Sequence, residues 1–282
     1  MRIIDGTSLA NDIKLQVKKE IEKNVKHCGG EVNFAAVLVG DNPASRIYIN
    51  RKKKACDEVG INMFVSEMNV NAGQAELNKK ISDLSADKNI HAILLQLPLP
   101  EGLNAREAIS YMDPRKDVDG LTFENFGKLA TEQYFLAPCT ANAVLYALEQ
   151  SGIPVAGKDV CVIGRSEIVG KPLSLLLMAR DATVTVCHKK TRDLEKHTCS
   201  ADIVVVAAGC PGLLCGDMIK SGAVVVDVGI NRMEDGTIVG DADFVSISGK
   251  ASAVTPVPGG IGPLTIAFLL NNIVHAWTAL SL

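Results

Sequence analysis

Closely spaced cysteine pairs, long basic tracts and membrane-length apolar runs are what this sequence lacks. None of its eight cysteines forms a Cys-x-x-Cys pair, so the spacing of zinc ribbons and dithiol redox motifs is missing. Cys161 and Cys187 lie in apolar stretches, where cysteine is typically a small buried hydrophobe. We therefore expect a reduced, cytoplasmic setting and no metal site.

The chain also lacks a large excess of charge of either sign. The chain has 29 basic and 32 acidic residues, a net charge of −3, and no lysine- or arginine-rich tract long enough to act alone, so we expect no nucleic-acid partner. Its longest apolar runs, such as residues 92–95 and 223–226, have strand length and are far shorter than a membrane span. The first six residues resemble neither a signal peptide nor an organelle leader. We expect no membrane association.

What is present is enough apolar residues for two buried cores. The chain has 282 residues, 47% of them hydrophobic, and this length favours two domains. Predicted strands alternate with predicted helices, which is typical of parallel sheets. We predict two α/β domains with a cleft between them: residues 1–140, and a Rossmann-type nucleotide-binding domain over 141–262. Residues 263–282 are predicted to form an apolar helix that packs back on the first domain.

A strand, a glycine loop and a helix follow one another after residue 159. The apolar run 160–163 meets Gly164 and a short loop containing Arg165 and Ser166, and a predicted helix starts near Lys171. Glycine after the strand allows a sharp turn, and the free N–H groups of the helix can face a pyrophosphate. The spacing departs from Gly-x-Gly-x-x-Gly and does not fit an ATP phosphate loop. An ordinary strand-to-helix turn stays an alternative.

The next predicted strand, 183–187, ends in His-Lys-Lys. An NAD site usually has an acidic residue near this distance to bind the ribose 2′-hydroxyl, and none is present. Arg165, Lys189 and Lys190 instead provide positive charge where a 2′-phosphate would bind, which favours NADP. For either lysine taken singly, a solvated basic loop is an equal explanation.

In the first half, the predicted helix 46–59, which we expect Ser45 to cap, carries an unusual lysine. At about 100° per residue, Lys52 lies on the apolar face one turn from Tyr48. Burial would lower the pKa of Lys52 and keep its amine neutral often enough to handle protons. Taken alone, Lys52 fits better as a lysine that buries its stem and extends its amine to water.

Three loops could hold ligands. Gln96 follows the predicted strand 90–95, at the edge where parallel sheets bind ligands, and could hold a lysine amine or a heterocycle, or merely cap the loop. The loop 113–120 has three carboxylates; one could bind an amino-pyrimidine edge, although such loops are usually only solvated. In the loop 253–263, prolines and glycines leave main chain open to a ligand, or form an interdomain turn.

Six segments, in this order and spacing, together resemble the methylenetetrahydrofolate dehydrogenase/cyclohydrolase family. They cover nearly the whole chain: Tyr48-Ile-Asn-Arg-Lys52, Gln96-Leu-Pro-Leu-Pro100, Lys116-Asp-Val-Asp-Gly120, Gly164-Arg-Ser-Glu-Ile-Val-Gly-Lys-Pro172, Asp227-Val-Gly-Ile-Asn231 and Thr255-Pro-Val-Pro-Gly-Gly-Ile-Gly-Pro263. The resemblance implies NADP-dependent oxidation of 5,10-methylenetetrahydrofolate and hydrolysis of the methenyl product. It also implies tetrahydrofolate derivatives as ligands and a homodimer.

The resemblance also implies residue roles. Lys52, Tyr48 and Gln96 match catalytic positions, and Asp119 matches the residue that holds the pterin ring. The expected substrate contacts further include Pro258 and Gly259, and the expected NADP contacts are Gly164, Arg165, Ser166, Ile230, Lys189 and Lys190. Two rivals stay open: a dehydrogenase without the hydrolase activity, and a non-catalytic NADP-binding sensor.

Overall fold

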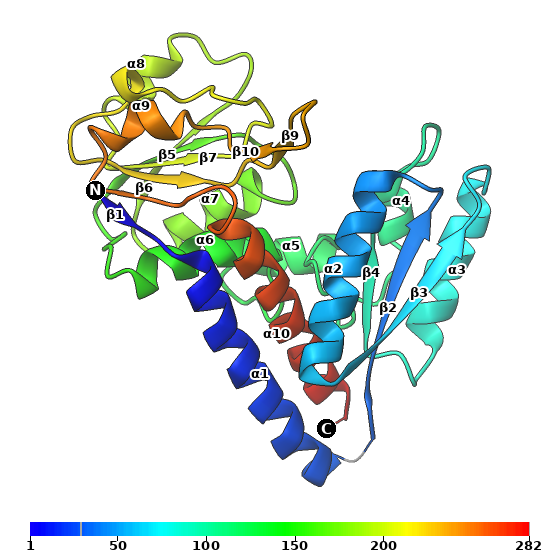
Figure 1. Cartoon of the computed structure of the whole chain (residues 1–282). Helices are drawn as coiled ribbons and strands as arrows, with labels where there is room; N and C mark the ends of the chain where they lie inside the picture. Colours follow the sequence, from blue (N-terminus) through cyan, green and yellow to red (C-terminus); the bar gives the residue numbers. More distant parts are fainter. Residues whose placement is uncertain (29, 282) are drawn as a thin grey trace. The chain divides into compact units, whose positions relative to one another are not determined.

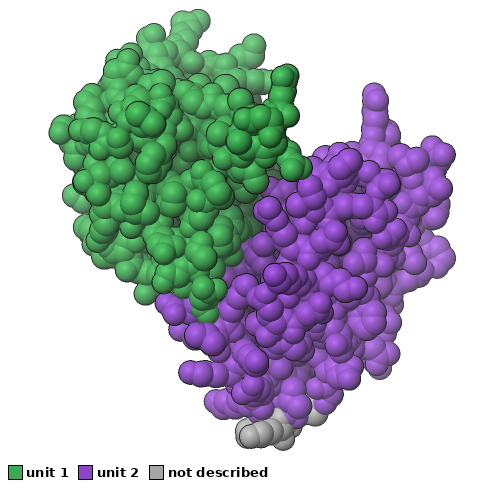
Figure 2. Space-filling view, viewed as in Figure 1, with its two compact units in different colours: residues 1–11, 140–265 green, residues 12–139, 266–282 purple. Residues whose placement is uncertain are grey.

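The chain forms two compact units. The structure, a computed structural model, describes residues 1–28 and 30–281 (Figure 1). Unit 1 comprises Met1–Asn11 and Thr140–Thr265, and unit 2 comprises Asp12–Cys139 and Ile266–Leu282 (Figure 2). Each unit has helices around a parallel sheet, as the sequence predicts.

Unit 1 contains a six-stranded sheet in the order β1-β11-β8-β7-β5-β6. All five pairings are parallel. The strands are β1 (Arg2–Ile3), β5 (Asp159–Ile163), β6 (Thr183–Cys187), β7 (Ile203–Val206), β8 (Val224–Asp227) and β11 (Ala253–Val254). The inner strands β7 and β8 are buried along their whole length, which explains their unbroken β-branched runs.

The first eleven residues do not belong with the rest of the predicted domain 1–140. Strand β1 pairs with β11 in the register Arg2 to Ala253, and the Ile4 amide donates to the Val254 carbonyl at 2.8 Å. Residues 1–11 therefore lie in unit 1. A two-residue strand that pairs only with residues 250 positions away leaves no local pattern to detect.

Helices and short elements connect the strands of unit 1. The helices are α6 (Cys139–Gln150), α7 (Gly170–Met178), α8 (Leu194–Thr198) and α9 (Phe244–Ser248), with the 3₁₀ turn η1 (Gly216–Met218). Strands β9 (Asn231–Arg232) and β10 (Ile238–Val239) form a small antiparallel hairpin. Apolar side chains of β5, β7, β8 and α9 share one core.

Unit 2 contains a parallel sheet in the order β3-β2-β4. Its strands are β2 (Val32–Val39), β3 (Ile61–Met68) and β4 (Ala92–Leu95), and an isolated bridge joins Ile93 to Asp117. The helices within unit 2 are α2 (Pro43–Val59), α3 (Gln74–Ala86), α4 (Ala105–Ile109) and α5 (Phe123–Ala130). Helices α1 (Gly6–Cys28) and α10 (Ile261–Ser281) begin in unit 1, and most of each lies in unit 2. Strands β2 and β4 and helices α3 and α4 bury one apolar core between them.

Helix α2 begins three residues earlier than predicted. Asn42 is its N-cap, and the Asn42 side chain accepts hydrogen bonds from the amides of Ala44 and Ser45. The prediction of Ser45 as the cap was therefore wrong, because Pro43 fits the first turn and extends the helix. Gly60 ends α2 in the left-handed conformation, at φ 87°.

Helix α10 is long and apolar enough to cross a membrane by length and composition, and among the residues described it alone passes that test. Half of its most apolar window is buried, including Leu264, Leu270 and Trp277. Burial of this kind is typical of a core helix and accounts for its apolar sequence.

Candidate functional site

A buried amide holds the lysine amine in unit 2. Gln96 is the first residue after β4 and is 7% exposed. Its Nε2 donates to the Leu97 carbonyl at 2.6 Å, which leaves Oε1 facing the other way. The Nζ of Lys52 donates to this Oε1 at 2.9 Å. The structure thus joins two of the predicted residues, and Tyr48 lies half-buried one turn before Lys52 on α2.

The surroundings of Lys52 favour its neutral form. Burial lowers the pKa of the Lys52 amine below its ordinary value, and the negative charge of Asp119 opposes part of that shift. A neutral amine can accept a proton, which an ordinary exposed lysine near pH 7 cannot. An amine in this setting can take part in proton transfer.

Asp119 is the carboxylate that acts on Lys52. Burial raises the pKa of Asp119, and the nearby Lys52 lowers it in part. The Sγ of Cys139 lies 3.6 Å from Asp119 Oδ1 and 3.4 Å from the Val118 carbonyl, and can donate its proton to either. Burial also raises the pKa of the Cys139 thiol well above its usual value, so the thiol keeps that proton.

Helix α10 fixes the loop that carries Asp119. The side-chain amide of Asn272 donates to the Val118 carbonyl at 2.8 Å and to the Ala137 carbonyl at 3.0 Å, and lies 3.5 Å from the sulfur of Cys139. Asn272 is 2% exposed, so its bonds are shielded from water. The backbone on both sides of Asp119 and Cys139 is thereby held in place.

The other charges of the 113–120 loop have structural contacts. The Nζ of Lys116 donates to the carbonyls of Ser85 and Asp87, both at 2.7 Å, at the end of α3. The carboxylate of Asp117 accepts from the Thr122 amide at 2.7 Å. Asp119 is therefore the carboxylate of this loop that influences Lys52.

In unit 1, the order in which the chain adds strands to the sheet reverses direction at β5. From β5 the chain proceeds to β6 on one side and then to β7 on the other. In open α/β sheets, ligands bind at the carboxyl ends of strands beside such a point. Gly164 lies there at φ 124°, so close to the Ala207 carbonyl that a Cβ would overlap it. Glycine is required for this approach.

The loop after Gly164 leads into α7 without a side-chain cap. Val169, the N-cap of α7, makes no side-chain capping bond, while Ser166 Oγ accepts from the Val169 amide at 3.1 Å. The Lys171 amide donates to the Ser166 carbonyl at 3.0 Å and Pro172 has no N–H, so at the start of α7 the Gly170 amide is the group that can face an anion. Backbone without a Cβ and an uncapped helix start fit a dinucleotide pyrophosphate.

Exposed cations follow the two neighbouring strands β5 and β6. Arg165 comes after β5, and Lys189 and Lys190 come after β6. The Gly164 amide donates to the Cys187 carbonyl at 2.9 Å, so the two loops start side by side. This arrangement can attract a phosphate beyond the pyrophosphate.

The remaining predicted residues of unit 1 follow strands further along the sheet. Ile230 is 44% exposed in the loop after β8, and its side chain approaches Gly262. Pro258 and Gly259 lie in the loop after β11, where the Gly259 carbonyl accepts from the Thr7 amide at 3.1 Å. Pro258 is exposed and Gly259 half-buried.

Sequence reasoning missed Cys139 and Asn272. Cys139 lies 20 positions from Asp119 and 133 positions from Asn272 along the chain, so no local pattern connects them. Within residues 1–28 and 30–281, no cluster of three or more His, Cys, Asp or Glu side chains could hold a metal.

Family models match both halves of the chain. The model described as "Tetrahydrofolate dehydrogenase/cyclohydrolase, catalytic domain" matches residues 4–119, and the one described as "Tetrahydrofolate dehydrogenase/cyclohydrolase, NAD(P)-binding domain" matches residues 138–281. The chain is 47% identical over 276 residues to the bifunctional protein FolD of Nautilia profundicola, covering 98% of this chain and 97% of that protein.

Solved structures give the same result. The bifunctional FolD methylenetetrahydrofolate dehydrogenase/cyclohydrolase of Campylobacter jejuni superposes with a TM-score of 0.95 at 46% identity, covering 99% of both chains. The Trypanosoma brucei FolD enzyme, solved with NADP cofactor and an inhibitor, has a TM-score of 0.94 at 36% identity, covering 98% of this chain and 97% of that one.

The geometry makes the pKa of Lys52 testable. Replacing Asp119 by Asn removes the negative charge that favours the ammonium form, so the pKa of Lys52 should fall further. Lysine side-chain NMR across a pH titration measures it, with Lys52→Met assigning the resonance. A pKa of Lys52 that is unchanged or higher in Asp119→Asn would show that the carboxylate does not act on the amine.

Proposed function

The chain belongs to the tetrahydrofolate dehydrogenase/cyclohydrolase family, and on that premise we propose that it catalyses two consecutive reactions. The first is NADP-dependent oxidation of 5,10-methylenetetrahydrofolate to 5,10-methenyltetrahydrofolate. The second is hydrolysis of that product to 10-formyltetrahydrofolate. The observation that carries the proposal is the buried Lys52–Gln96 pair with its neighbouring carboxylate, in a chain that also has a dinucleotide loop at Gly164.

Hydride loss from the one-carbon bridge needs little from the protein except alignment. The lone pairs of the folate nitrogens stabilise the cation that forms, so the step requires no protein base. Bound NADP supplies the hydride acceptor, and the loop at Gly164, Arg165 and Ser166 with the start of α7 would hold it. A protonated Lys52 would repel the methenyl cation. Its lowered pKa reduces that repulsion.

Hydrolysis requires a group that moves protons. Water adds to the methenyl carbon, and the neutral amine of Lys52 accepts a proton from the adding water. Ring opening then breaks the bond from this carbon to N5, which takes up one proton, while a second proton is released to solvent. Gln96 orients the amine through its 2.9 Å bond, and Tyr48, one turn away, is proposed to order substrate and water.

Substrate binding is proposed to involve Asp119, through paired hydrogen bonds from the amino-pyrimidine edge of the pterin. The thiol of Cys139 occupies one side of this carboxylate. Pro258 and Gly259, on their exposed loop, are proposed as further substrate contacts. Loss of the Asp119 carboxylate should raise the KM for folate in both reactions.

A single assay of the purified protein tests the function. The protein is mixed with methylenetetrahydrofolate and either NADP or NAD, and both NADPH and the methenyl product are followed by absorbance. Transient methenyl product that decays to 10-formyltetrahydrofolate is expected. Methenyl product that accumulates would identify a dehydrogenase without hydrolase activity, and binding without turnover would identify a sensor.

Lys52 should separate the two reactions. Lys52→Ala should abolish hydrolysis, because no amine remains to accept the proton, and should spare much of the hydride transfer. In the unaltered protein, hydrolysis should slow as the pH falls through the lowered pKa of Lys52, because the protonated amine cannot act as a base. Steady-state rates of each step measure this, with the exposed Lys53→Ala as control. Equal loss of both activities would refute the division of roles.

NADP is proposed as the preferred cofactor because Arg165, Lys189 and Lys190 are exposed cations in the neighbouring loops after β5 and β6, where they could bind a 2′-phosphate. Arg165→Ala should lower kcat/KM for NADP by about tenfold or more, since hydrogen bonds to charged groups are the strong ones, and should affect NAD much less. An equal effect on both cofactors would mean that Arg165 does not contact the 2′-phosphate. Lys158→Ala, at the opposite end of β5, is the matched control.

A homodimer in the cytoplasm is proposed as the working form. Strand β6 is at the edge of its sheet, and Thr183, Thr185 and Val186 are exposed on it. Such an edge is available to a second copy of the chain. The seven cysteines described are all free thiols, which fits a reduced cytoplasm. Light scattering should give about twice the 30.0 kDa chain mass. A mass equal to one chain would contradict the dimer.

A further inference from the structure

Two buried carboxylates lie between the loops that follow the strands of unit 1. Asp241 is fully buried and Asp227 is 4% exposed. Burying two carboxylates near one another is costly, and burial together with the charge of Asp241 raises the pKa of Asp227. Neither residue has a part in the chemistry proposed above. The hydrogen bonds that the two carboxylates accept must offset this cost of burial.

Asp241 binds the loop that follows β7. Its Oδ2 accepts from the amides of Ala208 at 2.6 Å and Gly209 at 2.9 Å, and its Oδ1 accepts from the amide of Cys210 at 2.9 Å. Three successive N–H groups directed at one anion form the concave arrangement that elsewhere binds phosphate. Here the protein's own carboxylate fills it, so this loop is held rigid and cannot use these N–H groups for a ligand.

The same carboxylate reaches the loop after β8. The side-chain amide of Asn231 donates to Asp241 Oδ1 at 2.8 Å, and the Gly229 amide donates to Asp227 Oδ1 at 2.9 Å. Ile230, a proposed NADP contact, therefore lies between two residues that are each held by a carboxylate: Gly229 by Asp227 and Asn231 by Asp241. The two carboxylates are themselves connected, because the amide of Asp241 donates to Asp227 Oδ1 at 3.0 Å.

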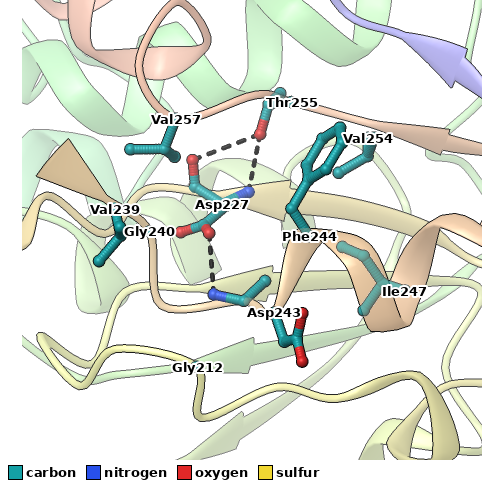
Figure 3. Close-up of a pocket in the computed structure, with 11 residues that line it drawn as sticks. Gly212, Asp227, Val239, Gly240, Asp243, Phe244, Ile247, Val254, Thr255 and Val257 are labelled. Atoms are coloured by element: carbon teal, nitrogen blue, oxygen red, sulfur yellow. Dashed lines mark hydrogen bonds between the residues drawn. The ribbon is translucent and has the colours of Figure 1, made fainter. Parts of the chain in front are cut away.

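Asp227 anchors this arrangement to the sheet. Its Oδ2 accepts from the Ala242 amide at 2.8 Å, and its backbone amide donates to Thr255 Oγ1 at 2.8 Å. Gly240 approaches Asp227 so closely that a Cβ there would overlap its Oδ2. Figure 3 shows Asp227 and Thr255 in the wall of a cavity of about 310 Å³, which Phe244 also lines. Asp241 does not line this cavity.

We propose that Asp241 is a positioning residue for the dinucleotide, which holds residues 208–210 and Ile230 in the arrangement that receives NADP. The proposal rests on the proposed function of the chain. The loops concerned follow β7 and β8, at the carboxyl edge of the sheet that also carries Gly164. Asp241 touches neither reactant. It acts through the backbone of one loop and the side chain of Asn231.

The test is the substitution Asp241→Asn in the full chain. An amide in place of the carboxylate turns an N–H₂ group toward backbone N–H donors, so part of the loop loses its acceptor. The Kd for NADP, from calorimetry, and the KM for NADP should rise at least about tenfold. Hydrolysis of added methenyltetrahydrofolate, which uses Lys52 in unit 2 and no dinucleotide, should stay within about twofold.

Asp243→Asn is the matched control. It makes the same chemical change two residues away, at an exposed N-cap of α9 that accepts from Ser246, and asparagine caps helices equally well. Its Kd for NADP should not change. Should Asp241→Asn fail to fold, Asn231→Ala removes only one of the four bonds to Asp241 and should raise the Kd for NADP with hydrolysis intact.

Two results would overturn the proposal. One is a folded Asp241→Asn protein, or failing that Asn231→Ala, that binds NADP as tightly as the unaltered chain. The other is a loss of hydrolysis in parallel with NADP affinity, which would indicate a general effect on folding. An unaltered chain that neither binds NADP nor turns over folate would instead refute the proposed function.

Discussion

The removal of one amine from water is the constraint on which the site in unit 2 depends. Burial of Lys52 disfavours its charged form, while the carboxylate of Asp119 favours it. Neither influence alone is useful, since a fully charged amine could not accept a proton and a lysine without polar partners would be costly to bury. Gln96 satisfies the amine in either protonation state, because its oxygen accepts from both. The site therefore depends on a balance between desolvation and one nearby charge.

Unit 1 uses buried charge differently. Its carboxylates at Asp227 and Asp241 receive backbone N–H groups and set the shape of loops, whereas the carboxylate in unit 2 adjusts the pKa of a neighbour. Asp227 and Asp241 are shielded from water, and in that setting a hydrogen bond to a charged group is stronger and its loss more damaging. The same residue type thus sets the shape of loops in one unit and the proton affinity of an amine in the other.

The sequence predicted what depends on local pattern. Strand β6 has the predicted bounds because it is a continuous run between turn residues, and the helical period placed Lys52 on the apolar face of α2. Contacts between distant segments were not predictable. Asn272 reaches Val118 across 154 positions, and β1 joins a strand near the other end of the chain. The cap of α2 was misplaced because Asn42, Pro43 and Ser45 all fit a helix start, and only the coordinates show which side chain accepts the amides.

The interleaving of the two units along the chain has a consequence for biosynthesis. Unit 1 takes its first strand from the N-terminus, and unit 2 takes Asn272 from the C-terminal helix. A ribosome producing these residues in order cannot pair β1 with β11 before residue 254 has emerged, nor place Asn272 against Val118 before residue 272 has. Both units therefore stay unfinished while most of residues 1–282 are being made, which ties their completion to one late stage of synthesis.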